Sequence, residues 1–352
     1  MNEPGTGPQV VSPRLAGLLQ MIYGAQTAQV IYVAAKLGIA DLLADDAKDL
    51  LEISATTGVD AGVLRRIFGM LVSRGLLARQ TDGRFSLTES GSLLRSDRAD
   101  SVRERAIFNA EILYPLWGEL LHSVTSGQSA AVRVFGKPLY EHLAEHPEAR
   151  TLFDRTMASA ARYRHGPAVA TYDFSRFSTI VDVGGGNGAL LISILKSCPK
   201  ARGVVFDLAP ASLRACQNIE AAGLGDRCTF VAGNAFERVP AGADAYVLSN
   251  FLIDMDDDRA CTVLGNCRAV MSDTGTLLLV EWMSASASEA DDEYRSWDTA
   301  SMDLIMLAVG GSSGGRVRTE DEFRAILNAS GFMLRRIVST GAAVRVIEAM
   351  PA

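Results

Sequence analysis

Short apolar runs alternate with amphipathic stretches through the second half of the chain, from about Ser178 onward. The runs that predict buried strands are TIVDVG, GVVFDL, CTFVAG, AYVLSNFL and TLLLVEWM. The stretches with helical spacing are GALLISILKSCP, ASLRACQNIEAAG, DDDRACTVLGNCRAVM and TEDEFRAILNASG, the last opened by a capping box of Thr319 and Glu322. Strands that alternate with helices predict a mostly parallel, doubly wound α/β sheet. FMLRRIVST and AVRVIEAM predict a closing hairpin that adds an antiparallel edge.

The first half of the chain has a helical pattern. Residues 14–43 carry apolar positions at helical spacing, and residues 100–170 again predict helices. Between them, two short helices flank a turn at Thr57, Gly58 and Val59, and a hairpin turns at Thr81, Asp82 and Gly83. The second short helix has one apolar face, made of Val63, Leu64, Ile67 and Leu71. This order of helix, turn, helix and hairpin predicts a winged helix.

The composition argues against several classes of protein. The chain has 352 residues, 48% of them hydrophobic, and a formal net charge of −7, which argues against broad binding of nucleic acid. It has no apolar run of about 20 residues and no secretory signal pattern, so we expect a cytoplasmic protein without a membrane span. Its five cysteines form no CxxC pair, so neither a disulfide framework nor a metal site is expected.

A glycine-rich loop follows the first predicted strand of the sheet. It reads VDVGGGNG, with Asp182 on the strand and Gly184, Gly186 and Gly188 in the turn that opens a helix. About 20 residues later Asp207 ends the next strand, where it can accept hydrogen bonds from ribose hydroxyls. The loop also fits a dinucleotide fingerprint. However, a carboxylate on the strand just before the glycines suits a ligand ammonium better than a pyrophosphate, which favours S-adenosylmethionine (SAM) over a nicotinamide cofactor.

At this point the chain resembles the SAM-dependent O-methyltransferases of the caffeic-acid and hydroxyindole type, with their bacterial antibiotic-pathway members. The resemblance rests on VDVGGGNG, VVFDLAP, GNAFERVP, LSNFLIDMDDDRACTVLGNCRAVM, LLLVEW and MDLIMLAVGG followed by GRVRTEDEFRAILNASGF. It implies a class I SAM-methyltransferase, Rossmann-like sheet behind a winged-helix domain that dimerises, covers the partner's site and does not bind DNA. The expected parts are a flexible tail (1–13), this dimerisation domain (14–110), a helical linker that contributes to the acceptor pocket (111–167) and a catalytic domain (168–352).

The resemblance also assigns residues to the cofactor. Asp182, Gly184 and Gly186 would hold the methionine part of SAM, Asp207 the ribose, and Asn234 and Phe236 the adenine. Gly188, Leu208, Ala235 and Ser249 complete the expected cofactor set. Asn234 stands where most relatives have aspartate, but its side chain can still accept a hydrogen bond from an adenine amine. The expected product is S-adenosylhomocysteine.

The acceptor is expected to be a flat aromatic or polyketide-like metabolite, because the expected pocket is rich in methionine and aromatic side chains. The positions that match this pocket are Trp117, Phe153, Met157, Met302, Asp303 and Met306. A methionine or aromatic residue at helical spacing can equally belong to the core. Asp303, in an apolar run, needs a partner, which Arg316 or Arg318 would supply.

The family's catalytic histidine is missing. O-methylating members read L-H-D-W-D-D after the fourth strand, whereas this chain has Ile253 at the position of the histidine, followed by Asp254. Glu281 matches one of two flanking glutamates, and Val317 replaces the other. A phenol with a pKa of about 10 is a weak nucleophile at neutral pH, so an enzyme gains from a positioned base.

Three hypotheses follow from the missing histidine. The acceptor is a nitrogen, carbon or acidic hydroxyl that needs no base, and positioning alone promotes transfer. A substitute base acts, with candidates Asp254, Glu281, Asp303 and His165. Or SAM is a charged scaffold for hydroxylation, decarboxylation or cyclisation without methyl transfer. Asp254 can equally cap the helix over 256–271, and His165, beside two arginines, is expected at the surface.

A different class of protein is a SAM-sensing transcriptional regulator that uses the winged helix. Such a protein needs a basic recognition helix. Residues 63–70 read VLRRIFGM and are mostly apolar, which suits an interface between subunits instead. We therefore expect a homodimer that binds a small-molecule acceptor and no nucleic acid.

Overall fold

The computed structural model describes residues 12–284 and 293–352, without the side chains of 160–164 and 293–296. It divides into two compact units, Met1–Tyr114 and Pro115–Ala352. Within the described residues, no helix combines the length and the apolar character needed to cross a membrane. Each unit has its own hydrophobic core, so each is described by itself.

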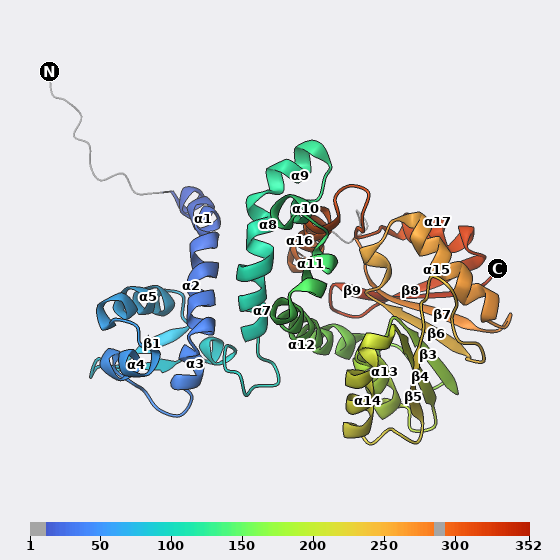
Figure 1. Ribbon diagram of the computed structural model, residues 1–352, viewed down its shortest axis with the longest axis horizontal. Coiled ribbons are helices and arrows are strands. Elements are labelled where there is room, and N and C mark those ends of the chain that lie inside the picture. Colours follow the sequence, from blue (N-terminus) through green and yellow to red (C-terminus); the bar gives the residue numbers. More distant parts are fainter. Residues whose placement is uncertain (1–11, 285–292) are drawn as a thin grey trace. The chain divides into compact units, whose positions relative to one another are not determined.

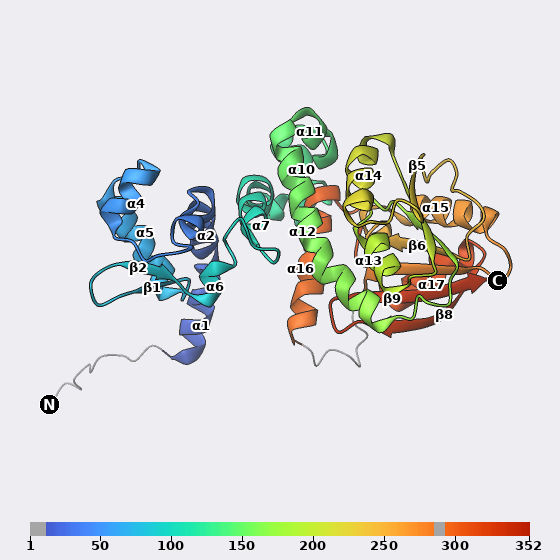
Figure 2. The same ribbon diagram turned by 90° about the horizontal axis from the view of Figure 1, so that it is seen from below.

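The first unit is a winged helix that begins with three further helices. Its elements are α1 (Pro13–Ile22), α2 (Gly24–Lys36), α3 (Ile39–Leu42), α4 (Leu50–Thr57), α5 (Ala61–Ser73), β1 (Leu77–Arg79), β2 (Phe85–Leu87), α6 (Glu89–Ser92), α7 (Arg103–Phe108) and a π-helical turn (Asn109–Leu113). The two strands pair antiparallel, with Leu77 opposite Leu87. Figure 1 shows β1 beside α4 and α5, and Figure 2 shows β2 next to β1, the arrangement that the sequence predicts.

Two expectations for this unit need correction. Val63 is 47% exposed, so the buried face of α5 is made by Leu64, Phe68 and Leu71 instead. Phe68 packs edge-to-face on Phe85 of the hairpin, with ring centroids 5.0 Å apart. The expected tail reaches too far, because the Ser12 hydroxyl caps α1 by accepting a hydrogen bond from the Leu15 N–H. The rest of that tail, residues 1–11, lies outside the described residues.

The second unit begins with helices and continues into the sheet domain. The helices are α8 (Tyr114–Gly118, whose first residue closes the first unit), α9 (Leu120–Ser126), α10 (Ala130–Phe135), α11 (Leu139–Glu145) and α12 (Pro147–Thr171). The long helix α12 crosses the expected boundary at 167/168 without a break, with Pro167 inside it. A single helix therefore connects the helical part to the sheet domain.

The sheet has seven strands in the order β5-β4-β3-β6-β7-β9-β8. They are β3 (Thr179–Val183), β4 (Arg202–Asp207), β5 (Cys228–Ala232), β6 (Ala245–Ser249), β7 (Thr276–Trp282), β8 (Phe332–Ser339) and β9 (Val344–Pro351). The first five run parallel, and β9 inserts antiparallel between β7 and β8. The α/β class and the antiparallel closing hairpin are confirmed. The strand order reverses between β3 and β6, where such sheets bind ligands.

Helices cover both faces of the sheet (Figures 1 and 2). They are α13 (Ala189–Ser197), α14 (Ser212–Ala221), α15 (Asp257–Val270) and α17 (Glu320–Ala329), whereas α16 (Glu293–Gly310) packs against α10. Successive strand residues enter opposite cores: Ile180 packs with α13 in one buried cluster, whereas Val181 packs with α15 and α17 in the other. This alternation explains why the strands are apolar on both faces. The capping box of Thr319 and Glu322 is confirmed at the start of α17.

Candidate active site

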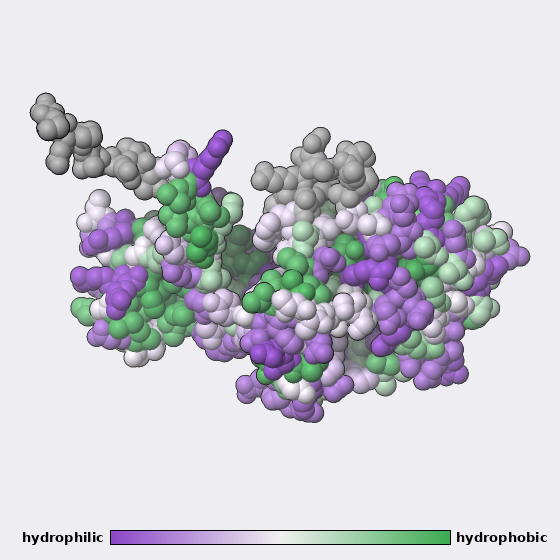
Figure 3. Space-filling view, turned by 90° about the horizontal axis from the view of Figure 1, so that it is seen from above, coloured by the Kyte–Doolittle hydropathy of each residue, from purple (hydrophilic) through white to green (hydrophobic). Residues whose placement is uncertain are grey.

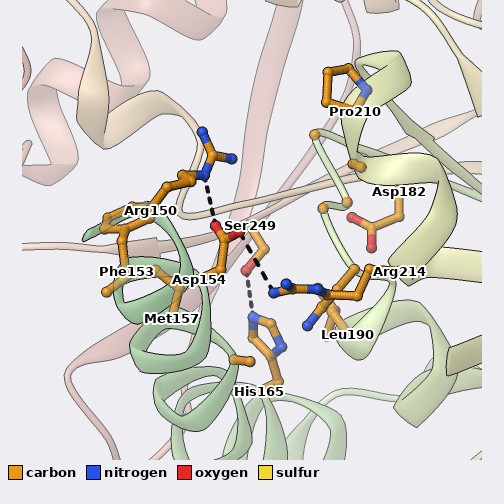
Figure 4. A pocket seen from close by; sticks show the side chains of 16 residues that line it. Arg150, Phe153, Asp154, Met157, His165, Asp182, Leu190, Pro210, Arg214 and Ser249 are labelled. Carbon is orange, nitrogen blue, oxygen red and sulfur yellow. Dashed lines mark hydrogen bonds and ion pairs between the residues drawn. The ribbon is translucent and has the colours of Figure 1, made fainter. Parts of the chain in front are cut away.

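A cavity of about 330 Å³ lies at the carboxyl ends of β3 and β6, with α12 as its opposite wall. It is lined by Arg150, Phe153, Asp154, Met157, Ala158, His165, Asp182, Gly184, Gly185, Gly186, Asn187, Leu190, Pro210, Ala211, Arg214 and Ser249. Figure 4 shows Asp182 on the opposite side of this space from the α12 residues Phe153 and Met157. The cavity therefore occupies the reversal point of the sheet.

The glycine loop takes a backbone conformation that other residues resist. Gly184 has φ +73°, and a Cβ there would lie 2.4 Å from the Phe251 ring. Asp207 holds the loop from the next strand, because its Oδ2 accepts a hydrogen bond of 2.7 Å from the Gly186 N–H. Its Oδ1 accepts another, of 2.6 Å, from the Leu208 N–H. Asp207 thus shapes the loop, and each of its oxygens keeps a lone pair for a ligand hydroxyl.

Asp182 is a buried carboxyl group with an unused oxygen. The residue is 2% exposed, and its Oδ2 has no hydrogen-bond partner among the described residues. Burial, and then the charge of Asp207, raise the pKa of Asp182 to about 7. A Cβ at Gly185 would come within 2.8 Å of this carboxyl group, so glycine is required beside it. Such a group is stabilised in its charged form by a ligand that brings a positive charge.

Three charged residues join α12 to α14 at this cavity. The Asp154 carboxylate lies 3.0 Å from Arg150 and 3.6 Å from Arg214, as Figure 4 shows. None of the three was among the expected site residues. Arg150 and Asp154 share a face of α12 at positions i and i+4, but that spacing alone also describes an ordinary solvated ion pair. Only the fold brings Arg214 to them.

His165 lines the cavity instead of lying at the surface as expected. Its Nε2 is 3.1 Å from the Ser249 hydroxyl at the end of β6, and the ring is partly buried. The Asn250 side chain donates a further hydrogen bond of 3.2 Å to the same hydroxyl. Asn250 has φ +49°, a left-handed conformation that asparagine adopts more readily than most residues. The end of β6 is thus built around Ser249.

The expected adenine residues lie outside the lining of this cavity. The Asn234 Oδ1 accepts a hydrogen bond of 3.1 Å from the Phe236 N–H, and its amide donates to Glu237. The Arg259 guanidinium lies over the Phe236 ring at 4.6 Å. These contacts fix the turn after β5, and contact of Asn234, Ala235 and Phe236 with adenine stays a prediction.

Ile253 stands in a short 3-10 turn (Leu252–Asp254) after β6, and its side chain is buried in the core. Glu281, which is 0% exposed, holds the turn: its Oε1 accepts 2.8 Å hydrogen bonds from the N–H groups of Phe251 and Leu252. Burial raises the pKa of Glu281 to about 8, against the lowering effect of these two bonds. Glu281 is therefore placed to shape the turn rather than to line the cavity.

Two predictions for acidic residues are wrong, namely that Asp254 caps the following helix and that Asp303 pairs with Arg316 or Arg318. Asp254 does not cap the helix that follows, because Asp256 accepts the capping hydrogen bond from Arg259 N–H at 2.8 Å, and α15 begins at Asp257. The Asp254 carboxylate instead accepts a hydrogen bond of 2.9 Å from the Tyr140 hydroxyl. Asp303 accepts a hydrogen bond of 2.9 Å from the Val317 backbone N–H.

The arginines expected to pair with Asp303 bind elsewhere. Arg316 and Arg318 both pair with Asp257, at 2.8 and 2.9 Å. Of the expected acceptor residues, Phe153 and Met157 line the cavity. Met302 and Met306 pack against the core cluster that contains Ile253 and Val317, and Trp117 is half-buried outside the lining. The sequence alone could not separate these two groups.

Comparison with known proteins assigns both parts of the chain to protein-family models. Residues 117–333 match the family model of the O-methyltransferase domain, and residues 19–97 match that of the O-methyltransferase dimerisation domain. The chain is 41% identical over 334 residues to the phenazine O-methyltransferase PhzM of Lysobacter antibioticus, covering 95% of each chain. It is 31% identical over 333 residues to the phenazine-1-carboxylate N-methyltransferase of Pseudomonas aeruginosa, covering 94% of this chain and 96% of that one.

Solved structures give the same result. The crystal structure of LaPhzM has a TM-score of 0.89 at 40% identity, covering 97% of this chain and 100% of that one. The O-methyltransferase NcsB1, solved with SAM and a naphthoic acid, has a TM-score of 0.77 at 30% identity, covering 93% and 96%. The nicotinamide alternative is thereby set aside. The chain belongs to the O-methyltransferase family, and it is a SAM-dependent methyltransferase with an N-terminal dimerisation domain.

Proposed function

We propose that this enzyme transfers the methyl group of SAM to an oxygen or nitrogen of a flat aromatic metabolite, releasing S-adenosylhomocysteine. The observation that carries the acceptor class is the similarity to two phenazine methyltransferases, one acting on oxygen and one on nitrogen, over nearly the whole chain. Phe153 and Met157 support it, because they give the cavity wall facing Asp182 an apolar, polarisable surface.

The cavity residues suit the charges of SAM. Asp182 offers its unused carboxylate oxygen to a cationic part of the cofactor, and Gly186, where the space of a Cβ is open, leaves room for close approach. Arg150 and Arg214 share the single carboxylate of Asp154, which leaves one positive charge in excess for an anionic group such as the methionine carboxylate. Asp207 is proposed to accept hydrogen bonds from ribose hydroxyls with its remaining lone pairs.

The cofactor supplies an electrophilic methyl group on a positively charged sulfur. The protein has to hold the acceptor atom in line with that methyl group and exclude other nucleophiles. Positioning of this kind contributes on the order of 7–11 kcal/mol in well-oriented reactions. Ile253, at the position of the family's histidine, carries no proton acceptor and is 6% exposed, so any base must come from another residue.

The experiment that tests the proposal uses SAM with an isotopically labelled methyl group. In one reaction the purified enzyme is incubated with labelled SAM and a monohydroxylated phenazine. In a second reaction it is incubated with labelled SAM and an unsubstituted phenazine. The proposal predicts a product that carries the label on oxygen or nitrogen, formed together with S-adenosylhomocysteine. If the enzyme binds SAM and converts the acceptor into a product without the label, that result would instead support the scaffold role. If it binds SAM and forms no product, that result would contradict the proposed acceptor class.

A further inference from the structure

The last residue of β6, Ser249, brings a hydroxyl group to the cofactor cavity. In the sheet, Leu248 pairs with Val183 of β3. The residues that follow this pair are Ser249 and Gly184, so the serine lies beside the glycine loop, and both line the cavity. On its other side Ser249 pairs with Val280 of β7, so the sheet fixes its backbone. The hydroxyl group therefore lies where the strand order reverses and the proposed cofactor binds.

Two neighbours use two of the three hydrogen-bonding positions of this hydroxyl group. A serine hydroxyl donates one proton and accepts at two lone pairs. The Asn250 amide group donates to Ser249 Oγ at 3.2 Å and occupies one lone pair. His165 Nε2 lies 3.1 Å from the same oxygen, a contact between α12 and the end of β6 that Figure 4 marks. With Nε2 as acceptor of the serine proton, the second lone pair of Ser249 remains for a ligand in the cavity.

Resting on the proposed methyl transfer, we propose that Ser249 and His165 form a relay that removes the proton of a hydroxyl acceptor. The acceptor oxygen forms its bond to the methyl carbon while the carbon–sulfur bond breaks and its electron pair stays on sulfur. The acceptor proton passes to Ser249 Oγ, and the serine's own proton passes to His165 Nε2. The imidazolium then loses one proton to solvent after the product leaves. Asn250 is a positioning residue, because its amide group fixes the serine oxygen.

The relay supplies a proton acceptor that the turn after β6 does not bring into the cavity. Ile253, at the position of the family's histidine, is 6% exposed and carries no acceptor. The lining residues include Ser249 and His165 but neither Ile253 nor Asp254. A histidine on α12, reached through a serine on β6, would thus do the work of a histidine in the turn.

The charges around the relay suit a cation on His165. The cofactor sulfur loses its positive charge as the methyl group leaves, and the imidazole gains one, so the net charge of the cavity stays constant. The charged residues that line the cavity are Asp154, Asp182, Arg150 and Arg214. The two arginines share Asp154, whereas one oxygen of Asp182 has no hydrogen-bond partner among the described residues and can stabilise a nearby cation.

The test separates proton removal from cofactor binding and from shaping of the site. Hydroxyphenazines are prepared whose hydroxyl pKa values, set by ring substituents, lie above and below the assay pH. The variants are Ser249→Ala, Ser249→Thr, which keeps a hydroxyl group, His165→Gln, and the double variant that combines Ser249→Ala with His165→Gln. Matched controls at half-buried positions outside the lining of this cavity are Ser193→Ala and His122→Gln. We measure kcat at saturating SAM, and SAM affinity by calorimetry.

We expect Ser249→Ala and His165→Gln each to lower kcat on the order of 100-fold for neutral hydroxyls and only slightly for acceptors that are already ionised. The double variant should lose no more than the single variants, because both residues carry the same proton. Ser249→Thr should keep most of the activity, and SAM affinity and both controls should stay at the wild-type level. Raising the pH should restore the rates of the variants as the acceptor ionises.

Four outcomes would overturn the inference. Weaker binding of SAM by Ser249→Ala, with unchanged kcat, would make the serine a cofactor residue. Equal losses along the whole acceptor series would give both residues a structural role, and losses that add in the double variant would show two independent roles. A wild-type enzyme that methylates only ionised acceptors would need no base. A wild-type enzyme that binds SAM and methylates none of them contradicts the proposed function itself, which distinguishes the two failures.

Discussion

At the scale of single residues, the enzyme keeps a carboxyl group where burial penalises its charge. Asp182 is 2% exposed, and its pKa is raised from 3.8 to about 7 by burial and by Asp207. The folded state therefore binds this proton more tightly than the unfolded state does. The contribution to stability is fully present below the ordinary pKa and is lost as the pH rises through about 7.

Asp182→Asn should therefore stabilise the enzyme without ligand, and increasingly so from pH 4 to pH 8. The shift corresponds to a gain of a few kcal/mol, because each pKa unit is worth about 1.4 kcal/mol. Thermal unfolding of the variant and the wild type over this range measures the effect. Asp226→Asn, at an exposed position, should show no such trend. A variant less stable than the wild type at pH 8 would contradict the burial argument.

At the scale of elements, the turn after β6 depends on Glu281 as a hydrogen-bond acceptor and not as a charge. Its pKa of about 8 leaves most of the carboxyl group protonated at neutral pH. Glu281→Gln should therefore change the unfolding free energy little at pH 4, where the carboxyl group is protonated in the folded and the unfolded state, and should stabilise the fold as the pH rises above 4.5. Glu281→Ala leaves the N–H groups of Phe251 and Leu252 without acceptors and should cost about 2–4 kcal/mol. Chemical denaturation at pH 4 distinguishes the two, and equal losses would show that an uncharged acceptor at this position does not hold the turn.

The glycine loop gives a second prediction at this scale. Both Gly184 and Gly186 have positive φ, but only at Gly184 would a Cβ meet another side chain. Gly186→Ala should therefore cost only the backbone strain of about 1–2 kcal/mol. Gly184→Ala adds a clash with Phe251 and should lower the melting temperature further. Indistinguishable melting temperatures would mean that the Phe251 ring moves away without cost.

The elements differ in how far the sequence predicts them. The sheet strands are recognisable because both faces are buried, which produces continuous apolar runs such as TIVDV, and the capping box of Thr319 is local. The contact between Tyr140 and Asp254 joins residues 114 positions apart, and no local pattern encodes it. Arg214 at the cavity, and His165 inside it rather than at the surface, likewise depend on how α12 and α14 pack.

At the scale of the whole molecule, the first unit presents apolar side chains to solvent. Leu18, Met21 and Ile22 of α1 are 55%, 78% and 61% exposed, and Figure 3 shows apolar surface over this helix. Because residues 19–97 match a dimerisation domain, we propose that this face is buried in a homodimer. Exposed apolar groups in such a cluster are typical of subunit interfaces.

Met21→Asp should weaken that dimer, because it places a charge among apolar groups at the interface. Sedimentation velocity over a range of concentrations should show a dimer for the wild type and a larger monomer fraction for the variant. Leu213→Asp, at an equally exposed apolar position on α14, is the matched control and should sediment like the wild type. A monomeric wild type, or an unaltered Met21→Asp dimer, would contradict the assignment of this face.

The central claim is that the cavity beside Asp182 holds SAM through this buried carboxylate. Titration of SAM into the wild type and into Asp182→Asn by calorimetry, from pH 5.5 to pH 8.5, tests it most directly. Because SAM would bind the ionised form of a group with a pKa of about 7, wild-type affinity should fall by up to about tenfold per pH unit below that value. Asp182→Asn should bind weakly at every pH. Wild-type affinity that is independent of pH, or tight binding by Asp182→Asn, would contradict the account.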